Sequence, residues 1–398
     1  MLDQDTSPPT ALAAIKENIF SIMREYSDLP DAAYRQKLKN TLTRLLFGSG
    51  LDRAARSRLF EEIYNRTRGL DLLQPLMDKP EVTEIMVNGT VDIFYEEAGK
   101  IRRSDLKFED RAQLENLVQQ LFSRVNRNLS LHHPIADARL PDGSRANAVL
   151  PPAAPDGPIL TLRKFTGIRP SPEALIKSGF ISAEALYFLR DQIRLKRSIF
   201  IAGGTGTGKT TLLNILAGFI PVDERIITIE DSAELKLNQI ENLVRLESRP
   251  PGPDGSGEIT IQDLLRSSLR MRPDRIIIGE VRGSEAADLM HAMNTGHPGS
   301  LCTGHGNSCA DMFHRLCNLA LEGSRLPLSA IEEIMAGCID IMVHISRTES
   351  GQRKVDEMVR LSLDQDRQAC FQTVYTPAEG LITDPRGNGK GDLTCSIE

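Results

Sequence analysis

The sequence predicts an α/β protein with a doubly wound C-terminal domain, a smaller N-terminal α/β domain and a helical N-terminal extension. Three observations predict this fold class. The chain has 398 residues, which is more than one hydrophobic core of ordinary size holds. Short apolar strands alternate with helical segments through the C-terminal half. A stretch with two prolines and two glycines, Thr166–Gly179, separates that half from an earlier segment of mixed helix and strand.

These changes of composition set the predicted boundaries. The two larger parts each have a size that is usual for a folded domain. The predicted parts are a helical extension (1–69), an N-terminal α/β domain (70–165), a linker (166–182), a doubly wound domain (183–375) and a loose tail (376–398).

The first predicted part is helical. Ile15, Ile19 and Ile22 recur at helical spacing within residues 11–47, and residues 51–68 predict a further helix. Amphipathic helices of this kind usually cover a core. We therefore expect a structural arm, and docking of a partner is the alternative.

The second predicted part alternates strand and helix. Val82–Gly89 and Val91–Glu96 alternate apolar and polar residues around an Asn-Gly turn, which is a strong local signal for a hairpin. Short helices are expected at 70–77 and 114–125. Further strands are expected within 136–152 and at 159–165, separated by Pro-Asp-Gly turns.

Beyond the linker, β-branched runs of strand length are separated by helical segments, as in an open sheet with helices on both faces. The last two strands are expected to form a hairpin through a Ser-Gly turn. The predicted strands are 198–203, 225–231, 242–248, 275–281, 300–306, 339–345 and 354–363, and the predicted helices are 212–219, 261–271, 284–294, 310–321 and 329–337.

Composition and charge limit the classes of function. The net charge of −6, the absence of Trp and an aromatic content of 5% argue against a basic, aromatic-lined channel for nucleic acid. No apolar run reaches the roughly eighteen residues of a membrane span. The acidic N-terminus lacks the pattern of a signal peptide, and the 6 cysteines form no C-x-x-C pair. These features favour an intracellular protein with reduced thiols and no zinc site.

The most informative segment, Gly203–Thr211, reads GGTGTGKTT and contains the spacing G-x-x-x-x-G-K-T. It lies between a predicted strand and a predicted helix. In that context glycines let the backbone wrap a phosphate, and the helix N-terminus stabilises its negative charge. Lys209 is expected between the outer phosphates and Thr210 in a magnesium shell. The predicted nucleotide-binding residues here are Gly204, Thr205, Gly206, Thr207, Gly208, Lys209, Thr210 and Thr211.

Acidic residues follow two of the predicted strands, where open α/β sheets bind their ligands. One strand runs into Glu230 and Asp231, and a later one runs into Gly279 and Glu280, where many phosphate-loop enzymes carry Asp in place of the glycine. We interpret Glu280 as holding Mg²⁺ through water and Glu230 as polarising the attacking water. The reverse assignment stays open, because spacing alone does not place a water. Helix caps or surface charges are the structural alternative.

Two histidines, His297 and His305, lie beside glycines on either side of a short predicted strand. Metal-ligand spacing is absent, so we expect no metal role for them. Because they follow the phosphate loop and the acidic positions, His305 is expected to contact the terminal phosphate or couple it to the neighbouring strand. A structural hydrogen bond is the usual alternative for a single His.

Four ordered segments together resemble one family. They are GGTGTGKTT, TIEDSAEL (228–235), LRMRPDRIIIGEVRG (269–283) and TGHPGSLCTGHGNS (295–308), and they are similar to the type II/type IV secretion ATPase superfamily. VTEIMVNG, ADARLPDGSRANAVLPP and LTLRKF favour its branch of CpaF/TadA-type ATPases of Flp (tight adherence) pilus assembly. The similarity covers residues 70–363, and the extension and the tail match least.

This resemblance implies a RecA-like C-terminal domain, ATP and Mg²⁺ as cofactors, and a homo-hexameric ring motor. The ring would lie in the cytoplasm, peripheral to the inner membrane, and act on an integral platform protein of a pilus or secretion system. The resemblance also implies that Arg145 and Arg163 of the N-terminal domain reach the phosphates and that Arg282 helps to couple subunits. Surface ion pairs are the alternative for the first two arginines. No nucleic-acid partner is expected.

The predicted activity is hydrolysis of ATP coupled to mechanical work, with Glu230, Glu280 and Lys209 as catalytic residues. Two other classes stay open. A RecA- or helicase-like nucleic-acid motor shares the phosphate loop, and DNA-stimulated turnover would identify it. A nucleotide-binding regulator with little turnover is the other class, because a motif does not report a rate.

Overall fold

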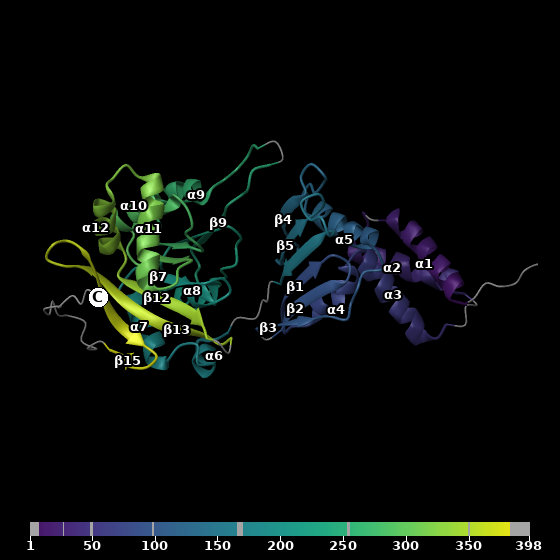
Figure 1. The fold of residues 1–398 in the computed structure, drawn as a ribbon, viewed down its shortest axis with the longest axis horizontal. Coiled ribbons are helices and arrows are strands. Elements are labelled where there is room, and N and C mark those ends of the chain that lie inside the picture. Colours follow the sequence, from purple (N-terminus) through teal and green to yellow (C-terminus); the bar gives the residue numbers. More distant parts are fainter. Residues whose placement is uncertain are drawn as a thin grey trace, which may run out of the picture. The chain divides into compact units, whose positions relative to one another are not determined.

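The chain divides into two compact units, Met1–Gly167 and Ile168–Glu398 (Figure 1). Both units combine helices with a sheet, so the predicted α/β fold class is confirmed. Within the described ranges, no helix is both long enough and apolar enough to cross a lipid bilayer. The computed structural model describes residues 8–26, 28–47, 51–97, 99–164, 170–252, 255–348 and 351–382.

Three helices open the first unit, as the sequence predicts. Asp52 caps the third helix, because its side chain accepts a hydrogen bond from the Ala55 N–H. Ile19, Leu38 and Ile63, one from each helix, are fully buried in a core that these helices form by themselves. Apolar packing therefore holds the extension together. The helices are α1 (Pro8–Arg24), α2 (Asp31–Leu45) and α3 (Arg53–Thr67).

An antiparallel 6-stranded sheet forms the rest of the first unit, in the order β3-β2-β1-β6-β5-β4. The predicted hairpin is present: Asn88 pairs with Asp92, and Gly89 between them has a φ of 73°. The sequence does not predict β3, because its residues are all exposed and show no apolar face. The elements are η1 (Asp71–Leu73), α4 (Gln74–Asp78), β1 (Val82–Asn88), β2 (Asp92–Glu97), β3 (Lys100–Arg103), α5 (Arg111–Ser123), β4 (Ile135–Arg139), β5 (Arg145–Val149) and β6 (Ile159–Arg163).

A 9-stranded sheet forms the second unit, in the order β15-β14-β13-β12-β7-β11-β10-β8-β9. The strands from β12 to β9 in this order are parallel, and β13, β14 and β15 extend one edge as antiparallel hairpins. The strands are β7 (Ile199–Gly203), β8 (Ile226–Glu230), β9 (Leu243–Glu247), β10 (Arg275–Ile278), β11 (Leu301–Gly304), β12 (Ile341–Arg347), β13 (Arg353–Leu363), β14 (Ala369–Thr376) and β15 (Gly380–Leu381).

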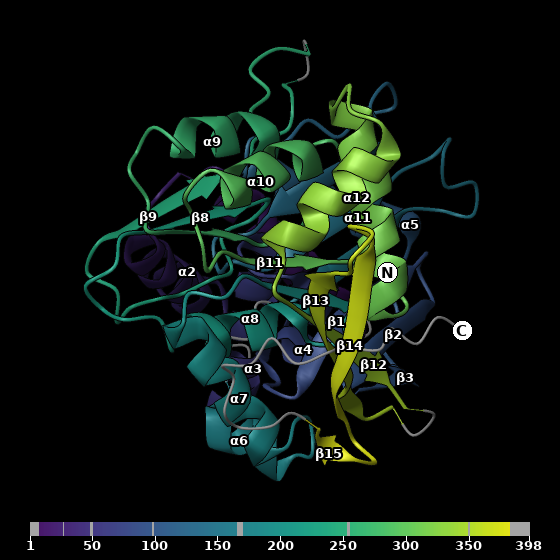
Figure 2. The same ribbon diagram turned by 90° about the vertical axis from the view of Figure 1, so that its left-hand side faces the viewer.

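Helices cover both faces of this second sheet (Figures 1 and 2). On β7, Ile199 and Ile201 belong to the core shared with α7 and α8, whereas Phe200 and Ala202 belong to the core shared with α9 to α12. Burial on both faces explains why this strand reads as a continuous apolar run. The helices are α6 (Pro172–Lys177), α7 (Ala183–Arg194), α8 (Lys209–Ala217), α9 (Ile261–Ser268), α10 (Glu285–Asn294), α11 (Cys309–Gly323) and α12 (Leu328–Cys338).

The predicted linker at 166–182 contains a helix, α6, that the sequence analysis does not anticipate. Ser171 caps this helix and a proline occupies its first turn, so the proline favours a helix start here. Leu175 is buried in the core of the second unit. Residues 165–169, where the rest of the linker prediction begins, lie outside the described residues.

The antiparallel edge of the second sheet extends further than predicted. The turn between β13 and β14 contains no glycine or proline, and Arg367 adopts the left-handed φ of 62°. Its only turn signal in the sequence is Asp364, whose side chain accepts from the Asp366 and Gln368 N–H groups, and Asp366. Gly380–Leu381 then pair with β14 within the segment predicted to be loose. The remainder of that predicted tail, residues 383–398, lies outside the described residues.

Candidate functional site

The glycine loop joins β7, an inner strand of the second sheet, to α8. Gly206 and Gly208 have φ values of 68° and 105°, which glycine adopts without strain. A Cβ on Gly208 would lie 3.2 Å from the Phe180 ring, and a Cβ on Gly203 would lie 2.5 Å from the Ile345 carbonyl oxygen. Side chains here would therefore collide with the packing behind the loop. The predicted residues Gly204–Thr211 lie together in this loop and the first turn of α8.

Lys209 is the first residue of α8 and is only 7% exposed. Its Nζ donates hydrogen bonds to the carbonyl oxygens of Gly203 at 3.0 Å and Gly204 at 2.9 Å. The same Nζ lies 3.3 Å from Nδ1 of His305. The loop thus holds a buried positive charge at the N-terminus of a helix, and both features favour an anion there.

His305 connects the glycine loop to an acidic strand end. Its Nε2 lies 3.1 Å from Oε1 of Glu280. The ammonium of Lys209 only donates, so Nδ1 of His305 accepts and Nε2 carries the proton that is donated to Glu280. Lys209, His305 and Glu280 therefore form one chain of hydrogen bonds.

Glu230 ends β8 and is only 3% exposed. Its Oε1 accepts hydrogen bonds from the N–H groups of Glu234 at 2.9 Å and Leu235 at 3.0 Å. Its Oε2 is buried and has no hydrogen-bond partner within the described part of the chain. Burial raises the pKa of Glu230 from 4.5 to about 7. A carboxyl with such a pKa takes up and releases a proton near neutral pH.

The parallel register brings the two acidic strand ends together. Ile229 of β8 pairs with Ile278 of β10, so Glu230 and Gly279 are neighbours. A Cβ on Gly279 would lie 3.0 Å from Cγ of Glu230. The glycine at the position where many phosphate-loop enzymes carry Asp therefore leaves room for the Glu230 side chain.

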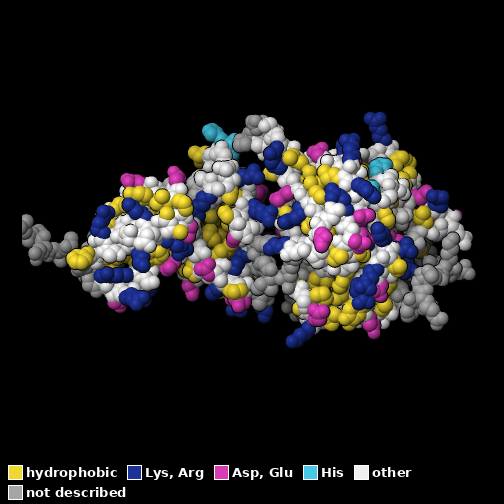
Figure 3. All heavy atoms as spheres, turned by 180° about the vertical axis from the view of Figure 1, so that it is seen from behind, with side chains coloured by type: hydrophobic (Ala, Val, Ile, Leu, Met, Phe, Trp, Pro, Cys, Tyr) yellow, Lys and Arg dark blue, Asp and Glu magenta, His cyan; other side chains and the backbone are white. Residues whose placement is uncertain are grey.

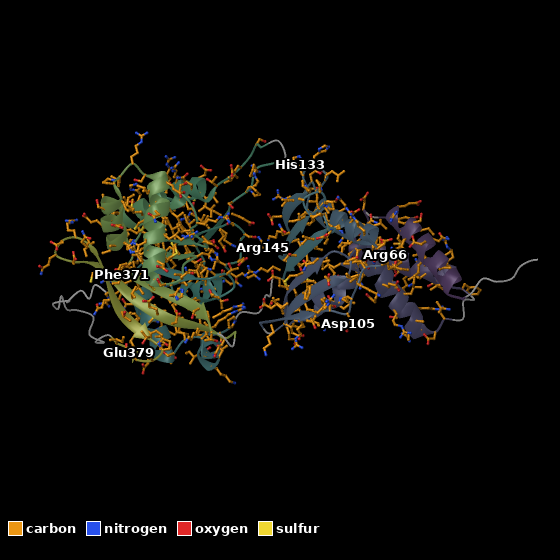
Figure 4. All side chains as sticks on the ribbon, viewed as in Figure 1. Arg66, Asp105, His133, Arg145, Phe371 and Glu379 are labelled. Atoms are coloured by element: carbon orange, nitrogen blue, oxygen red, sulfur yellow. The ribbon has the colours of Figure 1, made fainter. Side chains whose placement is uncertain are left out.

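Arg145 and Arg163 lie in the first unit, on β5 and β6, whereas the other predicted site residues lie in the second unit. The two arginines pair directly across the antiparallel strands and both are exposed. Figure 4 labels Arg145 at the surface of its unit. On its other side Arg163 pairs with Glu84 of β1, so opposite charges also face each other across these strands.

Sequence reasoning missed two residues that contact the site from β12. Arg347 donates a hydrogen bond to the Gly206 carbonyl oxygen at 3.2 Å. Nε2 of His344 lies 3.3 Å from the carbonyl oxygen of Gly306, the residue after His305. The available signal was a polar His near the end of the mostly apolar run 339–345, and an Arg two residues after that run. Their relation to the site depends on the pairing of β12 with β7.

Arg282 and His297, which the sequence also singles out, do not belong to the hydrogen-bond chain from Lys209 through His305 to Glu280. Arg282 forms a salt bridge with Asp231 at 2.8 Å, and Ser248 donates to the same carboxylate at 2.9 Å. Nδ1 of His297 is buried without a hydrogen-bond partner within the described ranges. The role of Arg282 between subunits stays a prediction.

The oxygen atoms near the loop fit a magnesium ion that is held mainly by substrate and water. Among the described residues, no group of three or more His, Cys, Asp or Glu side chains could hold a metal ion. Mg²⁺ usually keeps several waters and takes one or two protein ligands beside phosphate oxygens. Thr210 in the first turn of α8 and the partly exposed Glu280 carry oxygens of this kind.

Known proteins resemble this chain over most of its length. The family model described as type II/IV secretion system protein matches residues 67–381. A putative conjugal transfer protein of Mycobacterium tuberculosis is 34% identical over 322 residues, which cover 79% of this chain and 91% of that protein. The type IV secretion system protein VirB11 of Brucella suis is 34% identical over 303 residues, which cover 69% of this chain and 84% of that protein. Among solved structures, the ATPase DotB of Yersinia pseudotuberculosis shares the fold, with a TM-score of 0.53, 17% identity and coverage of 78% of this chain and 80% of that one.

Proposed function

This chain belongs to the type II/IV secretion system protein family, and on that premise we propose that it is an ATP-hydrolysing motor of a secretion or pilus-assembly system. Family membership supports the ATPase activity. The observation that carries the proposal is the hydrogen-bond chain from Lys209 through His305 to Glu280. This chain connects a phosphate-binding loop with a carboxylate at a strand end, which are the parts that phosphoryl transfer requires.

The residues of the loop supply binding and charge. The N–H groups of Gly206, Thr207 and Gly208 would hold the phosphates, and Lys209 would exchange its carbonyl contacts for the outer phosphate oxygens. Thr210 would hold Mg²⁺ directly and Glu280 through water. When bound, Mg²⁺ neutralises the charge that develops on the transferred phosphoryl group.

We assign the polarisation of the attacking water to Glu230. A general base works best when its pKa lies near the working pH, and burial gives Glu230 a pKa of about 7. Its Oε2 is a buried acceptor without a partner in the described residues, so a water admitted to this site would find an unused acceptor there. Glu280 already bonds to His305, which suits an orienting role.

The finer identity is a CpaF/TadA-type ATPase of Flp pilus assembly that works as a homo-hexamer with ATP and Mg²⁺. In this proposal, hydrolysis drives cyclic closure of the N-terminal and C-terminal domains. Arg145 and Arg163 reach the phosphates as the domains close, and their exposure and the permanent charge of arginine support this role. The ring acts in the cytoplasm, peripheral to the inner membrane, on an integral platform protein.

We propose no nucleic-acid partner. Lys and Arg side chains are interspersed with Asp and Glu on the face in Figure 3, and the whole chain carries a net charge of −6. A nucleic-acid motor would require a continuous basic path with stacking aromatic residues. DNA-stimulated turnover would contradict this part of the proposal.

ATP turnover and nucleotide binding by a Lys209→Ala variant test the proposed function. We expect its kcat/KM to fall by about 100-fold or more, because Lys209 is the buried charge of the loop. Lys177→Ala, at the exposed end of α6, is the matched control and should leave turnover unchanged. Wild-type chain without Mg²⁺-dependent turnover, or equal loss in both variants, would contradict the proposal.

A further inference from the structure

His344 is a buried residue of β12 with two polar contacts. It is 7% exposed, and its Nδ1 lies 2.7 Å from Oδ1 of Asp356 on β13. Its Nε2 lies 3.3 Å from the Gly306 carbonyl oxygen. A carboxylate and a carbonyl both accept hydrogen bonds, so both ring nitrogens must carry protons to satisfy these contacts. His344 is therefore held as an imidazolium, and its hydrogen bond to Asp356 raises its pKa despite burial.

An irregularity in the sheet creates this pair. His344 pairs with Glu357, but the next residue, Ile345, pairs with Val355, so Asp356 is the extra residue of a bulge in β13. Bulges of this kind redirect a side chain and often lie next to active sites. Here the bulge directs the Asp356 carboxylate to the imidazole of His344.

The same hairpin fixes both ends of the short segment that follows β11. His344 holds the Gly306 carbonyl at one end, and Oε2 of Glu357 accepts a hydrogen bond from the Cys309 N–H at 3.1 Å at the other. Gly306 packs closely against α11, because a Cβ there would lie 2.7 Å from Cβ of Met312. Holding its carbonyl therefore restrains the backbone next to His305.

We propose that His344 and Asp356 are positioning residues for ATP hydrolysis, which act through the Gly306 carbonyl to hold His305 between Lys209 and Glu280. This inference rests on the proposed ATPase function. In this proposal neither residue contacts the substrate. Their effect reaches the reaction only through the orientation of the His305 ring, whose two nitrogens contact the loop lysine and the strand-end carboxylate.

A double-mutant cycle between His344 and His305 tests this role. ATP turnover is measured for wild type, His344→Gln, His305→Ala and the double variant, and affinity is measured with a fluorescent ATP analogue. We expect His344→Gln to lower kcat by about tenfold while the affinity changes by less than about threefold. In the His305→Ala background, the same change should alter kcat by less than about twofold, because the two residues act as one unit.

Control variants separate this role from a general loss of packing. His314→Gln removes an exposed histidine of α11 that also faces a carboxylate, Glu332 at 3.8 Å, and should leave kcat unchanged. If His344→Gln does not fold, Asp356→Asn takes its place in the double-mutant cycle, because Asn has the size of Asp but no negative charge. If His344→Gln and His305→Ala lower kcat by independent factors that multiply in the double variant, the two residues do not act together and the inference is overturned. A change in ATP affinity without a change in kcat would also overturn it. Wild-type chain without any turnover would instead overturn the proposed function.

Discussion

Replacing Glu230 with Gln tests the account of the buried carboxyl most sharply. Glu230 is 3% exposed, and burial raises its pKa from 4.5 to about 7. The folded state therefore holds the proton more tightly than the unfolded state does. The resulting stability is fully present below the unfolded pKa of 4.5 and is lost as the pH rises through about 7. Gln does not ionise, so the variant should lack this loss.

The size of the pKa shift of Glu230 sets how much stability is lost as the pH rises. A rise from 4.5 to about 7 corresponds to about 3.4 kcal/mol between the two protonation states. About 2.5 kcal/mol of this difference develops between about pH 5 and about pH 8, because the unfolded carboxyl is already partly ionised at the lower pH. The change in packing that Gln causes is the same at both pH values, so comparing them isolates ionisation.

Thermal unfolding of the full chain at these two pH values is the assay, and the transition of the second unit is the one to follow. Relative to wild type, the Tm of Glu230→Gln should rise by about 5–10 °C more at the higher pH than at the lower, as expected for about 2.5 kcal/mol in a unit of this size. ATP turnover should fall by about 100-fold. Glu241→Gln, at an exposed position of the same unit, should show neither effect. Parallel Tm changes with pH in wild type and Glu230→Gln would show that ionisation of Glu230 does not destabilise the folded unit.

Two further substitutions test the surroundings of the loop. Gly279→Ala places a Cβ 3.0 Å from Cγ of Glu230, so we expect a loss of about 1–3 kcal/mol of stability and a lower kcat. A folded variant with wild-type kcat would show that this close contact does not affect hydrolysis. Arg347→Ala removes the hydrogen bond to the Gly206 carbonyl, so the KM for ATP should rise by about tenfold while kcat stays within about twofold. Lys354→Ala in the adjacent strand is its control, and an equal KM in the two variants would contradict a role for Arg347.

Local sequence pattern predicts the parts of the site that lie close together in the chain. The run from β7 through GGTGTGKTT into α8 shows its strand, turn and helix within a short stretch, because glycine spacing and apolar burial are both readable there. Glu230 is predictable for a related reason: it is the last residue of a mostly apolar strand that is buried on both faces.

The remaining features depend on pairing between distant segments. Arg347 lies 141 residues from Gly206 in sequence and contacts it only because β12 pairs with β7. The use of glycine at position 279 depends on the register of β10 against β8, and the pKa of Glu230 depends on its burial in the folded chain. A single sequence shows the residue types at these positions but not their neighbours.

Release of inorganic phosphate from Mg²⁺-ATP, measured for the purified chain and for its Glu280→Gln variant, tests whether this site hydrolyses ATP. We expect steady release by the wild type. The variant should bind ATP and release phosphate at least about 100-fold more slowly, because Gln can still accept from His305 but lacks the negative charge that Glu280 would offer to Mg²⁺ and its water. No release by the wild type would show that the chain is not an ATPase, and equal release by both proteins would show that Glu280 takes no part in hydrolysis.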